Sequence, residues 1–241
     1  MKKSPPKKAQ PTRAESAHLH ELFNESKNDE LEKYCRSLLV KYPKDGSIWQ
    51  TLGTALQRLG RLDDSIEAKI RGVQFSPNDA IALFNLGNSF RDFGRYEEAE
   101  QSYKKALKIN PKLKRAYYSL GLVLARLQRV NEAETCYQQE IFINPSLPDA
   151  HYALGNIQRE KGNLSAAELS YKEVIKINPN SADSYNNLGM IYAHSGNSTE
   201  AEKNFRKALE IHLNRFNYDM EQLNKSSIRE QIFSQNLAST Y

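Results

Sequence analysis

Proline recurs at a fixed interval of 34 residues along this chain of 241 residues. Asn-Pro pairs begin at Asn110, Asn144 and Asn178, and two earlier prolines, Pro43 and Pro77, lie on the same series. A constant period of about 20–50 residues is typical of repeat proteins, in which one supersecondary unit is copied and stacked. The sequence therefore predicts a linear array of similar repeats, each packed on its neighbours, rather than a fold around a single core.

Two further patterns keep the same period and show what each repeat contains. Leu-Gly pairs occur at Leu52-Gly53, Leu86-Gly87, Leu120-Gly121, Leu154-Gly155 and Leu188-Gly189. Alanines occur at Ala99, Ala133, Ala167 and Ala201, each followed four residues later by Tyr103, Tyr137, Tyr171 or Phe205. Side chains three and four residues apart share one face of a helix, so each repeat is predicted to be a pair of helices.

The ends of these helices are marked as well. The first helix is expected to end at a turn glycine that adopts positive φ, which is Gly60, Gly94, Gly162 or Gly196. In the 114–147 repeat Gln128 stands at that place. The second helix is expected to end before the proline, because the residue before a proline avoids the α conformation. The glycine of each Leu-Gly pair should lie where the two helices cross closest, so Gly121→Leu is expected to cost about 1–3 kcal/mol by overpacking.

These motifs resemble the tetratricopeptide repeat (TPR). The resemblance rests on Trp49-x-x-Leu52-Gly53, on Tyr185-x-x-Leu188-Gly189-x-x-Tyr192, on Ala99-x-x-x-Tyr103 and on the prolines. It implies an all-α, right-handed α-solenoid of about six helix–turn–helix repeats with a C-terminal capping helix. Five repeats span residues 46–79, 80–113, 114–147, 148–181 and 182–215, and a degenerate repeat spans 12–45. The 46–79 repeat departs from the pattern, because Ser65 and Lys69 stand where a small and an aromatic residue are usual.

Both ends of the chain are expected to differ from the repeats. Residues 1–13 are interpreted as a basic disordered tail, because Lys2, Lys3, Lys7, Lys8 and Arg13 occur there without any acid. Residues 14–241 are expected to form a single TPR solenoid, with residues 216–241 as its C-terminal cap. Within the cap, Ser227-Ile-Arg-Glu230 has the pattern of a capping box and predicts the start of a separate helix.

Composition and motifs argue against several classes of protein. The net charge is +5, and removing the five charges of the tail leaves a neutral body, so no nucleic-acid partner is expected. No apolar run approaches the roughly 20 residues of a membrane helix, and no apolar stretch of a signal peptide follows the basic start, so a cytoplasmic location is expected.

The same survey predicts no enzyme, cofactor or metal site. Nucleotide-binding loops, zinc-protease motifs and nucleophile elbows do not occur, and the five histidines and two cysteines do not share metal-ligand spacing. Cys35 and Cys136 lie three repeats apart, much farther than the roughly 7 Å between the Cα atoms of a disulfide. Both thiols are therefore expected to be reduced and to serve in packing.

The first helix of each repeat leaves one face open to a partner. Counting Gly46 as place 1 of its repeat, places 2, 5, 6, 9, 12 and 13 lie opposite the packed face, and the TPR resemblance implies that this inner face lines a concave, peptide-binding groove. The candidate site residues are Phe84, Asn85, Asn88, Arg91, Tyr118, Tyr152, Asn156, Arg159, Asn186 and Asn187. Exposed aromatics beside amides and arginines are typical of binding surfaces. In the alternative interpretation, the three aromatic rings partly pack against the next repeat.

The function predicted from these features is a non-catalytic scaffold that binds an extended peptide or a partner protein in the groove. An alternative is a substrate-recognition arm related to O-linked N-acetylglucosamine transferase-like glycosyltransferases or TPR sulfotransferases, lacking the catalytic domain. Asn85 and Asn187 resemble the asparagine ladder of those transferases, which Thr51, Ser119 and Ala153 interrupt.

Other modes of binding are disfavoured. The carboxylate clamp of chaperone adaptors is absent, because no repeat has Lys at place 5 or Arg at place 6. RNA binding is disfavoured because four acids offset the five arginines of the inner face. Weak self-association through the terminal helices is the remaining expectation about partners.

Overall fold

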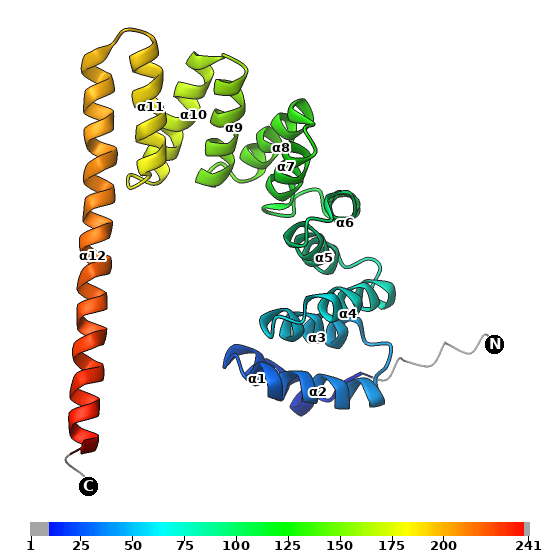
Figure 1. Ribbon diagram of the computed structural model, residues 1–241. Coiled ribbons are helices and arrows are strands. Elements are labelled where there is room, and N and C mark those ends of the chain that lie inside the picture. Colours follow the sequence, from blue (N-terminus) through cyan, green and yellow to red (C-terminus); the bar gives the residue numbers. More distant parts are fainter. Residues whose placement is uncertain (1–9, 239–241) are drawn as a thin grey trace. The chain divides into compact units, whose positions relative to one another are not determined.

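All regular secondary structure in the described part of the chain is α-helix. The computed structural model describes the backbone of residues 10–238 and the side chains of residues 10–219. Over that range it contains twelve α-helices and no strand (Figure 1). The helices are α1 (Arg13–Asn24), α2 (Asn28–Lys41), α3 (Gly46–Arg58), α4 (Leu62–Phe75), α5 (Ala80–Asp92), α6 (Tyr96–Ile109), α7 (Ala116–Arg126), α8 (Val130–Ile143), α9 (Pro148–Glu160), α10 (Leu164–Ile177), α11 (Ala182–His194) and α12 (Ser198–Ala238). The predicted all-α class and the pairing of helices are confirmed.

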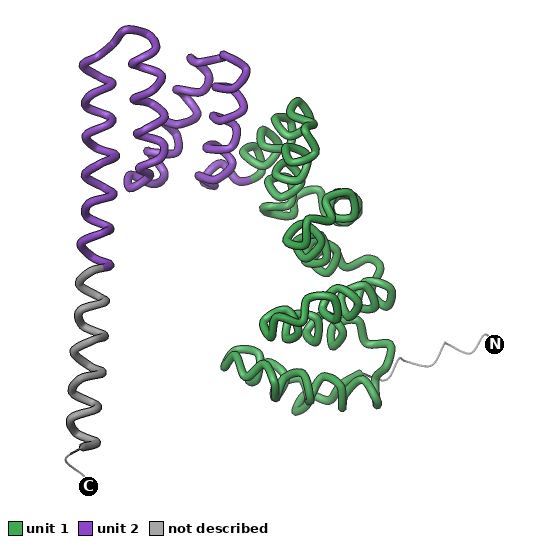
Figure 2. Tube along the Cα trace, viewed as in Figure 1, with its two compact units in different colours: residues 1–143 green, residues 144–241 purple. Residues whose placement is uncertain are grey.

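The helices group into two compact units, residues 1–143 and residues 144–241 (Figure 2). Unit 1 contains α1–α8, and unit 2 contains α9–α12. The expectation of a single body over residues 14–241 therefore differs from the observed division. The physical reason lies in the repeat architecture: a helix pair packs only on its immediate neighbours, so no common core ties distant repeats together.

The turns inside the repeats have the predicted backbone conformation. Gly60, Gly94, Gly162 and Gly196 all have φ between +73° and +78°. Gln128 takes the corresponding place in the 114–147 repeat and has φ +62° in spite of its side chain. A single residue in the left-handed region reverses the chain at the end of a helix, so these five positions define where α3, α5, α7, α9 and α11 end.

Aspartates begin the first helices of two repeats. The Asp45 carboxylate accepts hydrogen bonds from the backbone N–H groups of Ser47 and Ile48, at 2.9 and 3.2 Å, and Asp79 does the same at the start of α5. Such caps satisfy donors that have no partner inside the helix. Helices α3 and α5 consequently begin at the residue directly after the capping aspartate.

The N-terminus of α7 is capped in a different way. Its N-cap residue, Arg115, has φ +66° and no capping side chain of its own. Instead the fully buried Glu140 of α8 accepts hydrogen bonds from the backbone N–H groups of Arg115, at 2.7 Å, and Tyr118, at 3.3 Å. The equivalent place in other repeats holds Ala106 or Val174. A carboxylate from the second helix thus replaces the aspartate cap of the first.

The degenerate 12–45 repeat is ordered from Thr12 onward. Thr12 and Glu15 form a capping box at the start of α1, so Arg13 is the first residue of a helix and not part of a tail. Glu15 also accepts hydrogen bonds from Lys41, at 3.0 Å, and from Tyr42, at 2.9 Å. These donors, led by the backbone N–H of Thr12, lower the pKa of Glu15 to about 2. Residues 1–9 of the predicted tail lie outside the described residues.

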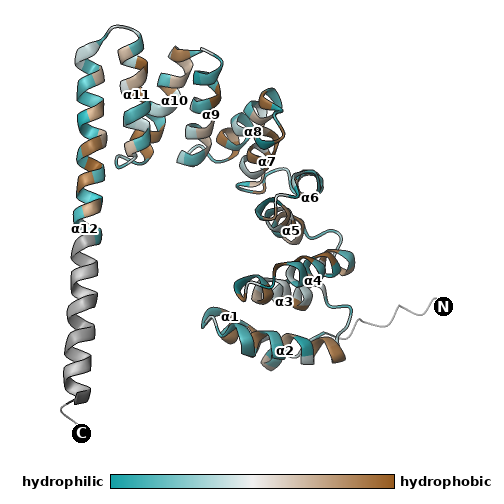
Figure 3. Cartoon of the chain, viewed as in Figure 1, coloured by the Kyte–Doolittle hydropathy of each residue, from teal (hydrophilic) through white to brown (hydrophobic). Residues whose placement is uncertain are grey.

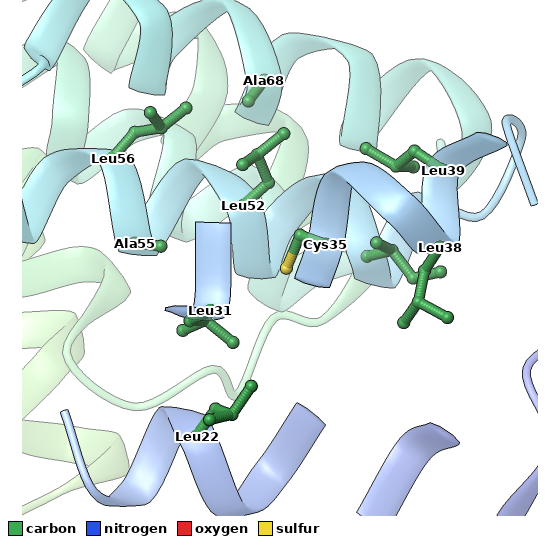
Figure 4. Packing of buried hydrophobic residues seen from close by; sticks show 10 residues of the cluster. Leu22, Leu31, Cys35, Leu38, Leu39, Leu52, Ala55, Leu56 and Ala68 are labelled. Carbon is green, nitrogen blue, oxygen red and sulfur yellow. The ribbon is translucent and has the colours of Figure 1, made fainter. Parts of the chain in front are cut away.

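The helices of unit 1 enclose a continuous apolar core at their N-terminal end. Leu22 of α1, Leu31 and Cys35 of α2, Leu52 of α3 and Ala68 of α4 are buried against one another (Figure 4). The helices of this unit carry both hydrophobic and hydrophilic residues (Figure 3), as amphipathic helices of a solenoid do. The core therefore runs from pair to pair instead of radiating from one centre.

The last helix does not follow the prediction for the cap. α12 is continuous from Ser198 to Ala238, and no new helix begins at Ser227. A capping box stabilises a helix start only where the chain turns, and no turn residue interrupts this segment. Leu209 and Phe216 of α12 are 59% and 61% exposed. The rest of the predicted cap, residues 220–241, lies outside the residues whose side chains are described.

Candidate functional site

Three repeats share one arrangement of a glycine and two aromatic rings. In α5 and α6, the Tyr103 ring occupies the space next to Gly87, where a Cβ atom would approach Tyr103 Cε1 to 2.7 Å. The Tyr103 ring also packs against Phe84, with centroids 5.6 Å apart. The same set recurs as Gly121, Tyr137 and Tyr118, at 5.9 Å, and as Gly155, Tyr171 and Tyr152, at 5.8 Å.

These contacts decide the position of the three predicted aromatic residues. Phe84, Tyr118 and Tyr152 are half-buried, and each pairs with the tyrosine of its own repeat. Tyr152 also contacts the next repeat, where Asn187 Nδ2 lies 3.4 Å from its hydroxyl. Tilted ring pairs at these separations are favourable. Each inner ring thus rests on a tyrosine of its own repeat, and the alternative interpretation, in which the rings partly pack against the next repeat, holds for Tyr152.

In the two remaining full repeats, both the tyrosine beside the glycine and the inner aromatic residue are replaced. Beside Gly53 stands Lys69, and the place of the inner aromatic is taken by Gln50, whose Nε2 donates to the backbone oxygen of Lys69 at 3.0 Å. Beside Gly189 stands Phe205, and the inner place holds Asn186. The inner aromatic is thus present only where the second helix supplies a tyrosine for it to pack against.

The predicted asparagines are partly engaged with these tyrosines. In unit 1, the Tyr103 hydroxyl donates to Asn88 Oδ1 at 2.8 Å. In unit 2, the Tyr171 hydroxyl donates to Asn156 Oδ1 at 2.8 Å. Asn187 is buried and places its Nδ2 3.4 Å from both Tyr152 Oη and Asn156 Oδ1. The amide nitrogens of Asn88 and Asn156 are held in fixed orientation by these bonds, whereas Asn187 mainly links neighbouring repeats.

Other predicted residues lie at the surface. Asn85 and Asn186 are exposed. Arg91 is half-buried and its guanidinium contacts the carboxylate of Asp92 at 2.9 Å. The Nε atom of Arg159 is buried and has no hydrogen-bond partner among the described residues, and a buried donor without a partner is costly.

The structure brings the ten predicted residues together in two sets, one on each unit. Phe84, Asn85, Asn88, Arg91 and Tyr118 belong to unit 1, and Tyr152, Asn156, Arg159, Asn186 and Asn187 belong to unit 2. The candidate list left out Gln50, Gln57 and Lys69 of the 46–79 repeat, which are joined by hydrogen bonds from Gln50 to the Lys69 backbone and from the Lys69 ammonium to Gln57. The signal that could have included them was present in the sequence, because Gln50 and Gln57 stand at places 5 and 12 of the inner face and Lys69 departs from the repeat pattern.

The described part of the chain offers little for catalysis. Burial raises the pKa of Cys35 to about 12 and that of Cys136 to about 11, so both thiols stay protonated, and both are free of disulfides. Among the described residues no group of His, Cys, Asp and Glu side chains is placed to hold a metal ion. No described helix combines the length and apolar character that a bilayer crossing requires.

Comparison with known proteins identifies the repeat. A family described as TPR repeat matches residues 87–128 and 155–196, and two families described as tetratricopeptide repeat match residues 114–146 and 182–214. A comparison with curated proteins found no match at the sequence level.

Several solved structures have a similar fold. The crystal structure of MamA is 29% identical in sequence, with a TM-score of 0.66 over 69% of this chain and 98% of MamA. YrrB, described as a TPR protein with an unusual peptide-binding site, is 22% identical, with a TM-score of 0.63 over 73% of this chain and 91% of YrrB. PilF from Pseudomonas aeruginosa is 16% identical, with a TM-score of 0.72 over 88% of this chain and 97% of PilF.

Proposed function

This chain is built of tetratricopeptide repeats, and we propose that it is a non-catalytic scaffold whose inner helix faces bind an extended segment of a partner protein. The observation that carries the proposal is the repeated set of glycine, tyrosine and inner aromatic residue. It fixes a half-exposed ring at the same place in three successive repeats. Rigid, partly exposed aromatic rings bind a partner with little loss of side-chain entropy.

The polar groups between the rings support a peptide as the ligand. Asn88 and Asn156 each use their oxygen for a tyrosine hydroxyl, which leaves the amide N–H groups oriented as donors to a backbone carbonyl. The buried Nε of Arg159 is a further donor that has no partner among the described residues. A bound backbone carbonyl or carboxylate would satisfy that donor and remove the cost of leaving it unpaired.

A test of this proposal must alter the surface without disturbing the packing beneath it. Tyr118→Ala would remove the ring that packs on Tyr137 and would lower stability as well as binding. Asn85→Ala combined with Arg91→Ala changes only an exposed amide and a guanidinium that is paired with an exposed aspartate. A double variant on the second helix of the same repeat, Lys104→Ala with Lys108→Ala, is the matched control.

The measurement is a pull-down from lysate, read by quantitative mass spectrometry, with the wild-type chain and both variants at equal melting temperature. A partner captured by the wild type and the control variant, and lost by the inner-face variant, supports the proposal. A partner that the inner-face variant retains in full would place the binding site elsewhere and refute the assignment to the inner face.

A second candidate is the substrate-recognition arm of a transferase-like system. It is suggested by the Asn-Leu-Gly runs at Asn85 and Asn187. Asn85 is exposed, whereas Asn187 is buried and bonded, so only one of the two offers the open amide that gripping a backbone needs. Turnover of a sugar or sulfate donor by the purified chain would overturn the non-catalytic assignment.

A further inference from the structure

One repeat of unit 1 contains a buried lysine where its neighbours contain a ring. Lys69 of α4 is only 3% exposed, and its Cγ occupies the space beside Gly53 that a tyrosine ring occupies beside Gly87 and Gly121. The apolar stem of the lysine therefore takes over the packing role of the ring. The ammonium group at the end of this stem reaches Gln57, at place 12 of the inner face.

The residues that contact the Lys69 ammonium group also differ from the residues at the same places of the other full repeats. Lys69 Nζ donates to the Gln57 side-chain oxygen and to Ser89 Oγ, the latter at 2.7 Å. The place of Ser89 is aliphatic or alanine in the other full repeats, at Ala55, Val123, Ile157 and Ile191. Gln57 lies on the predicted inner face of α3 and is half-buried, so it is the group that separates the ammonium from anything bound there.

No carboxylate of the described residues is in contact with the positive charge of Lys69. Both of its hydrogen-bond partners are neutral, and the nearby Asp92 is in contact with Arg91. Burying a cation among neutral groups is unfavourable unless an anion compensates it. Burial lowers the pKa of Lys69 to about 8, so the side chain is still mostly protonated at pH 7.

The other charged residues of the inner face in unit 1 are also mostly positive. Places 2, 12 and 13 of its three full repeats carry four arginines and one acid, which are Arg58, Arg91, Arg115, Arg126 and Asp92. In unit 2 the corresponding places carry Arg159 against Asp149, Glu160 and Asp183. The near-neutral total of the inner face thus divides into a basic set in unit 1 and an acidic set in unit 2.

We propose that the inner face of unit 1 selects an acidic side chain of the bound segment, which displaces the Gln57 amide from Lys69 and contacts Lys69 and Arg91. The inference rests on the proposed function, because it names the chemistry of the partner that the same surface binds. A carboxylate replaces a neutral acceptor on the ammonium and compensates the buried charge, and charge-assisted hydrogen bonds are stronger than neutral ones.

The experiment uses a phage-displayed library of random dodecapeptides, selected on the full chain as wild type, Lys69→Met and Lys104→Met. Lys104 lies on α6 and is exposed beside Glu100, so its variant removes one charge from the same unit without touching the inner face. Selection on the wild type and on Lys104→Met is expected to enrich Asp and Glu, and selection on Lys69→Met is not.

Binding of a selected acidic peptide is then measured by fluorescence anisotropy. Lys69→Met is expected to weaken it about tenfold, the typical contribution of a charge-assisted hydrogen bond. Asp92→Asn, which removes the competing carboxylate and leaves Lys69 in place, is expected to strengthen it. If Lys69→Met does not fold, the Asp92→Asn variant decides: unchanged or weaker binding overturns the inference.

The outcomes separate this inference from the function on which it rests. If the wild type selects no peptides at all, the proposed function and the inference both fail. If the wild type selects peptides without an excess of acidic residues, or if folded Lys69→Met keeps the same preference for acids, only the inference fails.

Discussion

Replacing Gly121 by alanine tests the contact on which the repeated ring arrangement depends. Alanine is favoured over glycine inside a helix by about 0.5–1 kcal/mol, so an unobstructed Gly121→Ala variant would be more stable than the wild type. In the structure the added Cβ atom would lie 2.5 Å from Tyr137 Cε1. Tyr137 is 2% exposed and also packs against Tyr118, with ring centroids 5.9 Å apart, so its ring cannot move aside freely.

The net effect follows from these two opposing terms. Overpacking a closely packed site costs typically about 1–3 kcal/mol. Subtracting the gain in helix propensity leaves an expected loss of up to about 2 kcal/mol in the free energy of unfolding. Gly121→Leu, which adds three more carbon atoms at the same point, should lose more than Gly121→Ala.

A double-mutant cycle shows whether the ring is the cause. Tyr137→Leu removes the obstructing atoms, so Gly121→Ala should cost less in that background, with a coupling of about 0.5–3 kcal/mol measured by urea unfolding. Gly94→Ala is the control, because a Cβ at Gly94 meets nothing within 4 Å and its cost comes from φ +73° alone. A Gly121→Ala variant that is more stable than the wild type, or that shows no coupling to Tyr137, would refute the reasoning.

Three further measurements probe other groups. Glu140→Ala should lower the free energy of unfolding by about 1–3 kcal/mol, because two N–H groups at the start of α7 lose their acceptor; an unchanged urea midpoint would contradict this cap. The pKa of Lys69 is lowered from 10.5 to about 8, so above pH 8 the unfolded chain binds more protons. The stability of the wild type relative to Lys69→Met should therefore rise by about 1–3 kcal/mol between pH 8 and pH 10, and a flat difference would contradict the burial of the charge. Both cysteines should react slowly with a thiol reagent at pH 8 until the chain unfolds, Cys35 more slowly than Cys136, since the pKa values are about 12 and about 11; fast labelling of the folded chain would count against this.

The repeat boundaries could be predicted because they depend on local backbone chemistry. A residue that adopts positive φ and a proline that blocks the α conformation each act within a few residues, and the turns at Gly60 and Gln128 have the predicted conformation. The positions of the small residues opposite the rings could also be predicted. Periodicity alone was enough to place them on the facing sides of two helices.

The features that the sequence did not reveal depend on contacts between helices. The cap of α7 by Glu140 joins residues 25 and 22 positions apart, which no local motif encodes. The separate helix predicted at Ser227 was wrong because a capping box has the same residues inside a continuous helix as at a helix start. The coupling of Gln50 to Lys69 required knowledge of which side chain fills the space beside Gly53.

The candidate site was predictable in part, because the side of a helix on which a residue lies depends only on local helical geometry. Helical geometry placed Phe84, Tyr118 and Tyr152 on one side of their helices, and the structure shows them half-buried there. Helical geometry could not reveal that Asn187 is buried, because the exposure of an amide depends on the neighbouring repeat. Whether these residues bind a partner stays a prediction.

The contact between glycine and the side chain opposite it has a consequence for how the chain acquires its fold. In every full repeat the two residues are 16 positions apart, as in Gly87 and Tyr103, so the contact closes within one helix pair. Folds dominated by short-range contacts form quickly, and a repeat array can nucleate at more than one place. The pairs that contain a tyrosine are good candidates for such nuclei. The pair with Lys69 must bury a charge to close, so its amide hydrogens should be among the first in unit 1 to exchange with solvent.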